Sequence, residues 1–266
     1  MKNNIKGNLI IIGGAEDKEN GKAILKEVCT KINKEKDQLV IATVASQLPE
    51  ELGIEYENIF KNLGVKNIKI LNVKNRKDAL NKENIEMIKN ASLVFFTGGD
   101  QLRITSLLGG TPLYYMMKER YKGGCDFVGT SAGASVMSNT MIVTGPSEES
   151  PRKCTLKMAP GLDFIRGVII DQHFAQRGRI GRLLTGIAEN PEVLGIGIDE
   201  DTAIVVNNKL QFKVIGSGAV YVIDGSEISY TNVSEQNQDE LLSILDVKLH
   251  VLKNRDEFSI NTRKPM

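Results

Sequence analysis

Short apolar runs alternate with longer amphipathic segments through the first half of the chain. The runs are almost continuously apolar, which is typical of strands that are covered on both faces of a sheet. The longer segments repeat apolar residues at helical spacing, as at Ala23, Val28 and Ile32. The pattern predicts strands at residues 8–12, 38–45, 67–71, 93–97 and 127–129, and helices at residues 21–33, 50–63, 77–90 and 112–122. The expected fold is α/β, with a mostly parallel central sheet and helices on both of its faces.

The pattern changes after about residue 195, where strands joined by tight turns replace the alternation. These strands are predicted at residues 195–206, 211–215, 219–223 and 227–230. Tight turns join antiparallel strands, so we expect an antiparallel C-terminal extension of the same sheet. No repeat and no linker rich in Pro, Gly or Ser divides the chain, and we therefore expect a single domain over residues 1–266.

The composition excludes several classes of partner. Lys and Arg number 34 against 33 Asp and Glu, so the net charge of +1 argues against binding to nucleic acid or to an anionic membrane. No apolar run approaches the 18 residues of a membrane span. The three cysteines, Cys29, Cys125 and Cys154, are odd in number and widely spaced, which favours a reducing cytoplasm. With only two histidines and no nucleotide-binding motif, we expect no metal and no cofactor.

A serine lies in a G-x-S-x-G pattern at residues 129–133, directly after a predicted strand. This strand–turn–helix context is the one in which a nucleophile elbow exposes its serine. The backbone N–H of Ala132 would then point toward a developing oxyanion. The alternative is a glycine-rich turn with an incidental serine. The context favours Ser131 as a nucleophile.

A serine nucleophile needs a base, and the chain has two candidates. His173 follows a strand-like run and lies among polar and charged residues, whereas His250 lies in an apolar alternation that is typical of a packed or surface histidine. His173 is therefore the predicted base. The third member of a triad would be one of three consecutive acids, Asp199, Glu200 and Asp201, and the residues alone leave open which one.

Two further features indicate how a substrate would be held. Gly98 and Gly99 follow a predicted buried strand, so a second backbone donor could approach the substrate there. Three of the ten arginines, Arg177, Arg179 and Arg182, fall within six positions shortly after His173. Guanidinium groups bind carboxylates in a bidentate manner, which predicts an anionic substrate. A solvated basic face is the alternative.

Together these residues resemble the cyanophycinase family, serine peptidases related to the aspartyl dipeptidases. The matching blocks, in order, are Gly13–Lys18, Phe96–Gln101, Gly129–Ala134, Asp171–Leu183 and Gly197–Ala203. The resemblance implies hydrolysis of cyanophycin, a poly-aspartate with arginine on each β-carboxyl, by exo-cleavage to β-aspartyl-arginine dipeptides. It implies a homodimer that needs no metal. It also implies Ser131 as nucleophile, His173 as base, Glu200 as orienting acid, Gly99 and Ala132 as the oxyanion hole, and Gln101, Asp171, Gln172, Arg177, Arg179 and Arg182 as substrate-binding residues.

Other functions are possible on such a fold. The order Ser, His, Glu along the chain differs from that of the α/β-hydrolases, which counts against a lipase or esterase. An α-aspartyl or isoaspartyl dipeptidase acting on small peptides is the main alternative. A glutaminase-like protein would have Cys where Ser131 stands, and a binding protein would not need Ser, His and an acid together.

Overall fold

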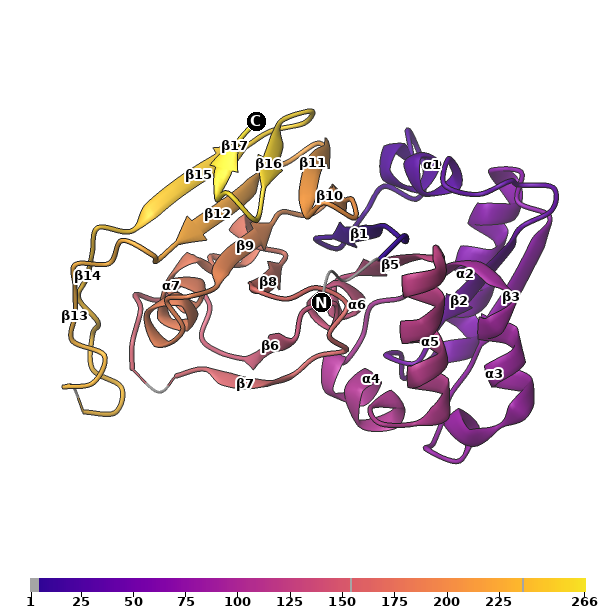
Figure 1. Ribbon diagram of the computed structural model, residues 1–266, viewed down its shortest axis with the longest axis horizontal. Helices are drawn as coiled ribbons and strands as arrows, with labels where there is room; N and C mark the ends of the chain where they lie inside the picture. Colours follow the sequence, from indigo (N-terminus) through magenta and orange to yellow (C-terminus); the bar gives the residue numbers. More distant parts are fainter. Residues whose placement is uncertain (1–4, 154, 236) are drawn as a thin grey trace.

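The computed structural model describes residues 5–153, 155–235 and 237–266, so Cys154 lies outside the described residues. Its largest sheet has nine strands in the order β17-β16-β11-β10-β1-β5-β4-β2-β3 (Figure 1). Five of them are parallel: β1 (Leu9–Ile12), β2 (Gln38–Ala42), β3 (Asn67–Leu71), β4 (Ala91–Phe96) and β5 (Asp126–Thr130). The predicted parallel sheet is therefore confirmed.

Helices cover both faces of this sheet, as the sequence predicts. Strand β1 shows why, because Leu9 and Ile11 join one buried cluster while Ile10 and Ile12 join another. The helices α1 (Ala23–Cys29) and α2 (Pro49–Asn62) pack on the cluster that contains Ile10 and Ile12. The helices α3 (Lys82–Lys89), α4 (Gln101–Leu108) and α5 (Pro112–Gly123) cover the first cluster, which contains Leu9 and Ile11. The helix expected at residues 77–90 is divided into a 3-10 turn (Asp78–Leu80) and α3, and α4 was not predicted.

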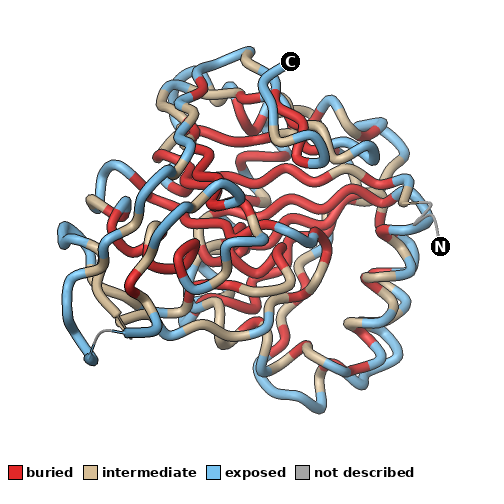
Figure 2. Tube along the Cα trace, turned by 60° about the vertical axis from the view of Figure 1, so that its left-hand side comes forward, coloured by how far each residue is buried: buried red, intermediate tan, exposed pale blue. Residues whose placement is uncertain are grey.

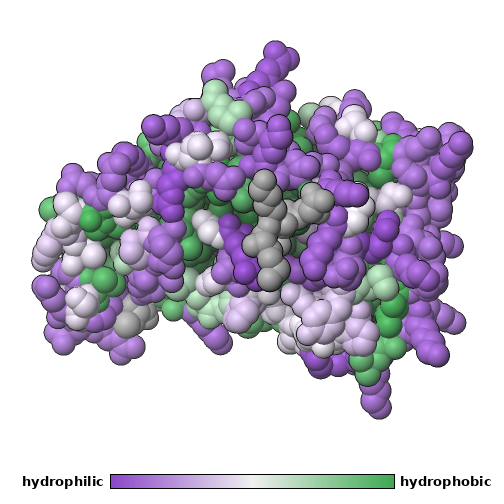
Figure 3. Space-filling view, in the orientation of Figure 1, coloured by the Kyte–Doolittle hydropathy of each residue, from purple (hydrophilic) through white to green (hydrophobic). Residues whose placement is uncertain are grey.

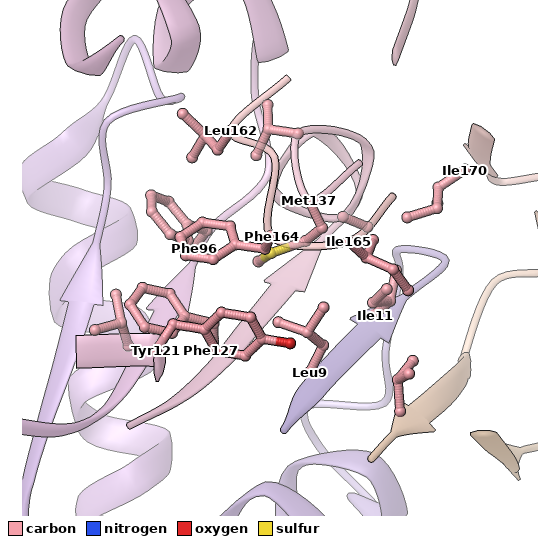
Figure 4. Packing of buried hydrophobic residues seen from close by; sticks show 14 of the residues in the cluster. Leu9, Ile11, Phe96, Tyr121, Phe127, Met137, Leu162, Phe164, Ile165 and Ile170 are labelled. Carbon is pink, nitrogen blue, oxygen red and sulfur yellow. The ribbon is translucent and has the colours of Figure 1, made fainter. Parts of the chain in front are cut away.

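Aromatic side chains fill the centre of the first cluster (Figure 4). Phe127 on β5 stacks on Phe164 with ring centroids 4.5 Å apart, and Tyr121 of α5 meets both rings edge-on. The central strands β1, β4 and β5 are almost completely buried, whereas the helices are exposed on their outer turns (Figure 2). This packing fixes the ends of β1, β4 and β5 relative to one another.

The antiparallel extension is present, but it is divided between two sheets. Strands β10 (Thr202–Val206), β11 (Gln211–Gly216), β16 (Glu257–Ser259) and β17 (Lys264–Pro265) extend the large sheet beside β1. A separate four-stranded sheet has the order β15-β12-β9-β8, with β8 (Val168–Gln172), β9 (Leu194–Ile198), β12 (Val220–Asp224) and β15 (Lys248–Leu252). Helix α7 (Ile180–Glu189) joins the parallel pair β8 and β9 and packs on this second sheet.

The single strand expected at residues 195–206 is the main error of the prediction. Residues 199–201 form a turn in which Asp201 has φ of 46°, and this turn sends the chain from β9 in one sheet to β10 in the other. The expectation of one continuous sheet fails for the same reason, because β12 pairs with β9 and not with β11.

Smaller elements complete the structure. The short helix α6 (Ala132–Ser135) follows β5, and a 3-10 turn (Ala175–Arg177) precedes α7. Two hairpins are formed by β6 (Thr140–Thr144) with β7 (Lys157–Pro160), and by β13 (Tyr230–Thr231) with β14 (Ile244–Leu245). None of the helices in the described parts of the chain has the length and apolar character needed to cross a membrane.

Candidate active site

Ser131 occupies a tight turn between β5 and α6. Its backbone has φ of 53° and ψ of −112°, a conformation that costs a non-glycine residue about 1–3 kcal/mol. The Ser131 N–H donates to the carbonyl of Ile12 at 3.1 Å, which ties the turn to the end of β1. A Cβ at Gly129 would lie 2.1 Å from the carbonyl oxygen of Gly133, so the first glycine of the pattern permits this turn.

His173 lies beside Ser131 although the two residues come from different sheets. The Nε2 atom of His173 lies 2.9 Å from Ser131 Oγ. His173 follows β8 with φ of 49°, and its backbone N–H donates to the carbonyl of Gly13 at 2.8 Å. The imidazole is therefore held from the end of β1 as well as from its own strand.

Glu200 is the acid that reaches the imidazole. Its Oε1 lies 2.6 Å from His173 Nδ1. Its two neighbours face elsewhere: Asp199 accepts hydrogen bonds from the backbone N–H groups of Ala175 and Ala219, and Asp201 accepts from the N–H of Asp17. The structure thus distinguishes three acids that the sequence alone does not. With Nδ1–H donated to Glu200, Nε2 is the nitrogen that can accept the Ser131 proton.

The surroundings hold the pKa of His173 below its ordinary value of 6.5. Burial is the largest cause, because it disfavours the charged imidazolium. The positive charges of Arg177 and Arg179 act in the same direction, and the hydrogen bond to Glu200 opposes them. The imidazole is therefore neutral at pH 7 and able to accept a proton.

Two backbone segments border the serine where an oxyanion would form. Ala132 is the first residue of α6. On the other side, a Cβ at Gly98 would lie 3.5 Å from Ser131 Cβ, so the Gly98–Gly99 turn lies against the serine. Gly99 has φ of +142°, and a Cβ there would fall 2.2 Å from the carbonyl oxygen of Ala45.

The predicted substrate-binding residues fall into three groups. Asp171, Gln172, Arg179 and Arg182 form one buried cluster next to His173. Within it, Arg182 binds both carboxylate oxygens of Asp171, and Arg179 donates to Asp171 at 3.4 Å and to Gln172 Oε1 at 2.6 Å. Asp171, which the resemblance implies as a substrate-binding residue, is thus already paired within the chain.

The other two residues lie apart from this cluster. Arg177 is exposed and forms no ion pair with any described residue. Gln101, at the start of α4, donates from Nε2 to the carbonyls of Ile142 and Val143 on β6, at 3.1 and 3.0 Å. No group of three or more His, Cys, Asp or Glu side chains in the described parts of the chain is arranged to hold a metal ion.

The loop from Gly13 to Asp17 also belongs to the site, although the sequence predicts no role for it beyond a matching block. Gly14 has φ of +98°, and a Cβ there would lie 2.4 Å from the Nε2 atom of His173. The Gly14 carbonyl accepts from the N–H of Asp201 at 2.9 Å. Glu16 is buried and accepts hydrogen bonds from Thr130 Oγ1 at 2.6 Å and from the Tyr56 hydroxyl. One loop therefore contacts His173 and the immediate neighbours of both Ser131 and Glu200. Its signal in the sequence is the double glycine after the first strand.

Comparison with known proteins shows the family of this chain. The model of peptidase family S51 matches residues 9–214. A cyanophycinase from Geminocystis herdmanii is 40% identical over 100% of this chain and 98% of its own length. A cyanophycinase from Synechococcus elongatus is 37% identical over 97% of this chain and 81% of its own length. The crystal structure of a peptidase from an acI-B1 Actinobacterium shares the fold, with a TM-score of 0.69, 22% identity, and coverage of 97% of this chain and 98% of that one. The chain therefore belongs to peptidase family S51 and is a serine-type peptidase.

Proposed function

We propose that this protein hydrolyses cyanophycin, multi-L-arginyl-poly-L-aspartate, and releases β-aspartyl-arginine dipeptides from the chain end. The observation that carries the proposal is the line of contacts from Ser131 Oγ to His173 Nε2 at 2.9 Å and from His173 Nδ1 to Glu200 at 2.6 Å. The substrate follows from the cyanophycinases, which align along nearly the whole chain. Residues 1–266 act as a single catalytic domain in this proposal.

The reaction proceeds through an acyl-enzyme. Ser131 Oγ attacks the scissile carbonyl carbon while His173 Nε2 takes its proton, and Glu200 stabilises the resulting imidazolium. The backbone N–H groups of Gly99 and Ala132 hold the oxyanion of the tetrahedral intermediate. His173 then gives the proton to the leaving amine. In the second half, His173 takes a proton from water, whose oxygen attacks the acyl carbon. His173 then returns this proton to Ser131 Oγ as the acyl–oxygen bond breaks.

The proposed substrate contacts are Gln101, Gln172, Arg177, Arg179 and Arg182, and Asp171 is proposed to support them. Arg177 is the most accessible of the three arginines and has no carboxylate partner among the described residues, so it is suited to bind a substrate carboxylate. Arg179 has a buried Nε that lacks a hydrogen-bond partner in the described parts of the chain, and a carboxylate would satisfy it. Asp171 contributes indirectly in this scheme, because its carboxylate fixes the positions of Arg179 and Arg182.

The polymer-clearing assay on wild type and Ser131→Ala tests the proposal. The wild type is expected to clear an insoluble suspension of cyanophycin and to release β-aspartyl-arginine. Ser131→Ala is expected to lose turnover by a factor on the order of 10⁶, because the members of such a triad act as a unit. Normal turnover in that variant would exclude Ser131 as the nucleophile.

His173 and His250 provide a matched pair of variants. His173→Ala is expected to abolish turnover. His250→Ala is expected to keep most of it, because His250 lies on β15 and packs edge-on against Phe258 with ring centroids 5.4 Å apart. The alternative function, an α-aspartyl or isoaspartyl dipeptidase, predicts a preference for small dipeptides over the polymer, and the same enzyme preparation can be assayed on both.

We also propose a homodimer in the cytoplasm. Ile180, Leu245 and Leu249 are exposed and line an apolar cavity of about 470 Å³, and in Figure 3 hydrophobic colour gathers over α7 and β14 at the left. A second copy packed there would remove this surface from water. Sedimentation is expected to give a dimer for the wild type and a weaker dimer for Leu249→Ser. A monomeric wild type would refute the proposed dimer.

Cys29 and Cys125 are buried free thiols, which supports the proposed location in a reducing compartment.

A further inference from the structure

A cleft lined by both polar and apolar residues lies beyond the ends of β2 and β4, and the proposed mechanism does not use it. Two cavities, of about 690 Å³ and 410 Å³, adjoin there. Gln47 and Arg103 line both of them. Asp100 lines the larger cavity, and Glu51 lines the smaller one.

The cleft is close to Ser131 along the same edge of the sheet. Strands β5, β4 and β2 are consecutive neighbours, and Ser131 follows β5 while the Gly98–Gly99 turn follows β4. Arg103 Nε donates to the carbonyl of Val44, just beyond β2, at 3.1 Å. Adjacent strands are separated by about 4.8 Å, so the cleft begins roughly 10 Å from the nucleophile. A polymer chain that occupies the active site reaches this far within a few backbone residues, at about 3.5 Å each.

Of the charged side chains that line the cleft, Arg103 and Glu51 form no ion pair with any described residue. Asp100 forms none either, but its carboxylate accepts hydrogen bonds from the backbone N–H groups of Leu102 and Arg103 at the start of α4. Arg103 is half-buried and held through its Nε, yet none of the ion pairs in the described parts of the chain includes it. Glu51 is exposed and likewise forms none, whereas its neighbour Glu50 is paired with Lys74 at 2.9 Å. A ligand that carries both charges would satisfy both side chains.

Each side branch of cyanophycin has this character. The arginine is attached through its α-amino group, so its α-carboxylate and its guanidinium both stay free. We propose that the cleft is a second subsite, which binds the arginyl branch of a polymer unit beyond the two units that flank the scissile bond. Arg103 takes the branch carboxylate, and Glu51 takes the branch guanidinium. The inference rests on the proposed function, and it makes the enzyme favour long substrates over the smallest cleavable one.

The test compares steady-state kinetics on two substrates, the β-aspartyl-arginine dimer and an oligomer of several units. Arg103→Gln is expected to raise KM for the oligomer about tenfold, the effect of losing one charge-assisted hydrogen bond, and to leave kcat and the dimer kinetics unchanged. Glu51→Gln is expected to act in the same way. Arg166→Gln and Glu35→Gln are the matched controls, because both residues are exposed and lie outside the cleft.

Three results would count against the subsite. Two of them would leave the proposed function standing, and the third would overturn the proposed function as well. An unchanged KM for the oligomer in Arg103→Gln would overturn it. Equal losses on dimer and oligomer would also overturn it, because they would assign Arg103 only a structural role through Val44. A wild-type enzyme that cleaves neither substrate would instead overturn the proposed function, and the subsite with it.

Discussion

Gly14→Ala is the sharpest test of how the site is positioned. The new Cβ would lie 2.4 Å from both Cε1 and Nε2 of His173, where ordinary van der Waals contacts begin at 3.4 Å. The loop cannot simply retreat, because Gly13 N–H donates to Thr202, and the Gly13 and Gly14 carbonyls accept from His173 and Asp201. The imidazole is therefore the group that moves, by about 1 Å.

A displacement of this size has a predictable cost. A misplacement of about 1 Å in a reacting group reduces the rate roughly 100-fold, which corresponds to about 2.7 kcal/mol in the activation free energy. Independently of the clash, an alanine in left-handed backbone lowers the free energy of unfolding by about 1–2 kcal/mol. We therefore expect a protein that folds, unfolds at a moderately lower temperature and has lost about 99% of its kcat/KM.

Gly110→Ala separates the two effects. Gly110 also has a positive φ, of +72°, but a Cβ there meets no atom within 4 Å. This control is expected to lose a similar amount of stability in thermal unfolding while it keeps wild-type turnover of cyanophycin. The reasoning would be refuted by wild-type turnover in Gly14→Ala, or by an equal loss of turnover in Gly110→Ala.

Two further predictions follow from the electrostatics of the site. The acid limb of kcat/KM should have its midpoint below pH 6.5, because turnover needs neutral His173 and the pKa of His173 is lowered. Arg177→Gln removes a positive charge that lowers this pKa, so the midpoint of its acid limb should move to higher pH. For the wild type, 1 M salt should move the midpoint in the same direction, because salt screens that charge. A pH profile that responds to neither change would contradict the assignment of the acid limb to His173. Asp171→Asn leaves two buried guanidinium groups without their carboxylate and should lower the free energy of unfolding in urea by about 3–5 kcal/mol. Glu119→Gln, which breaks the exposed ion pair with Lys122, should change it little; equal effects would refute the argument.

The parts of the fold that local chemistry determines could be predicted from the sequence. The parallel strands are apolar runs, and α5 begins where Thr111 and Pro112 predict, with the Thr111 hydroxyl accepting from the N–H of Tyr114. The break between β9 and β10 could not be predicted in this way. Residues 195–206 look like one strand because both halves are apolar, and only pairing with distant strands assigns them to different sheets.

The same distinction holds for the candidate site. Local patterns indicate Ser131 and His173, because a G-x-S-x-G turn and a histidine after a strand are short-range features. The choice of Glu200 among three acids depends on the direction of each side chain at the turn, and the resemblance, not the spacing, supplied it. The burial of Arg179 and Arg182 around Asp171 could not be predicted from the sequence either. A solvated arginine and a buried one have the same sequence pattern, because the difference depends on a partner that only the fold brings close.

The divided extension has a consequence for when the enzyme becomes active. Ser131 follows a strand of the large sheet, His173 follows a strand of the second sheet, and Glu200 lies where the chain crosses between them. The crossing is secured by pairing of β1 with β10, which joins residues as distant as Leu9 and Val206. A ribosome-bound chain cannot make this pairing until β10 has emerged, and domains built on such distant contacts close late. Hydrolytic activity is thus withheld during synthesis and arises only as the last third of the chain folds onto the first strand.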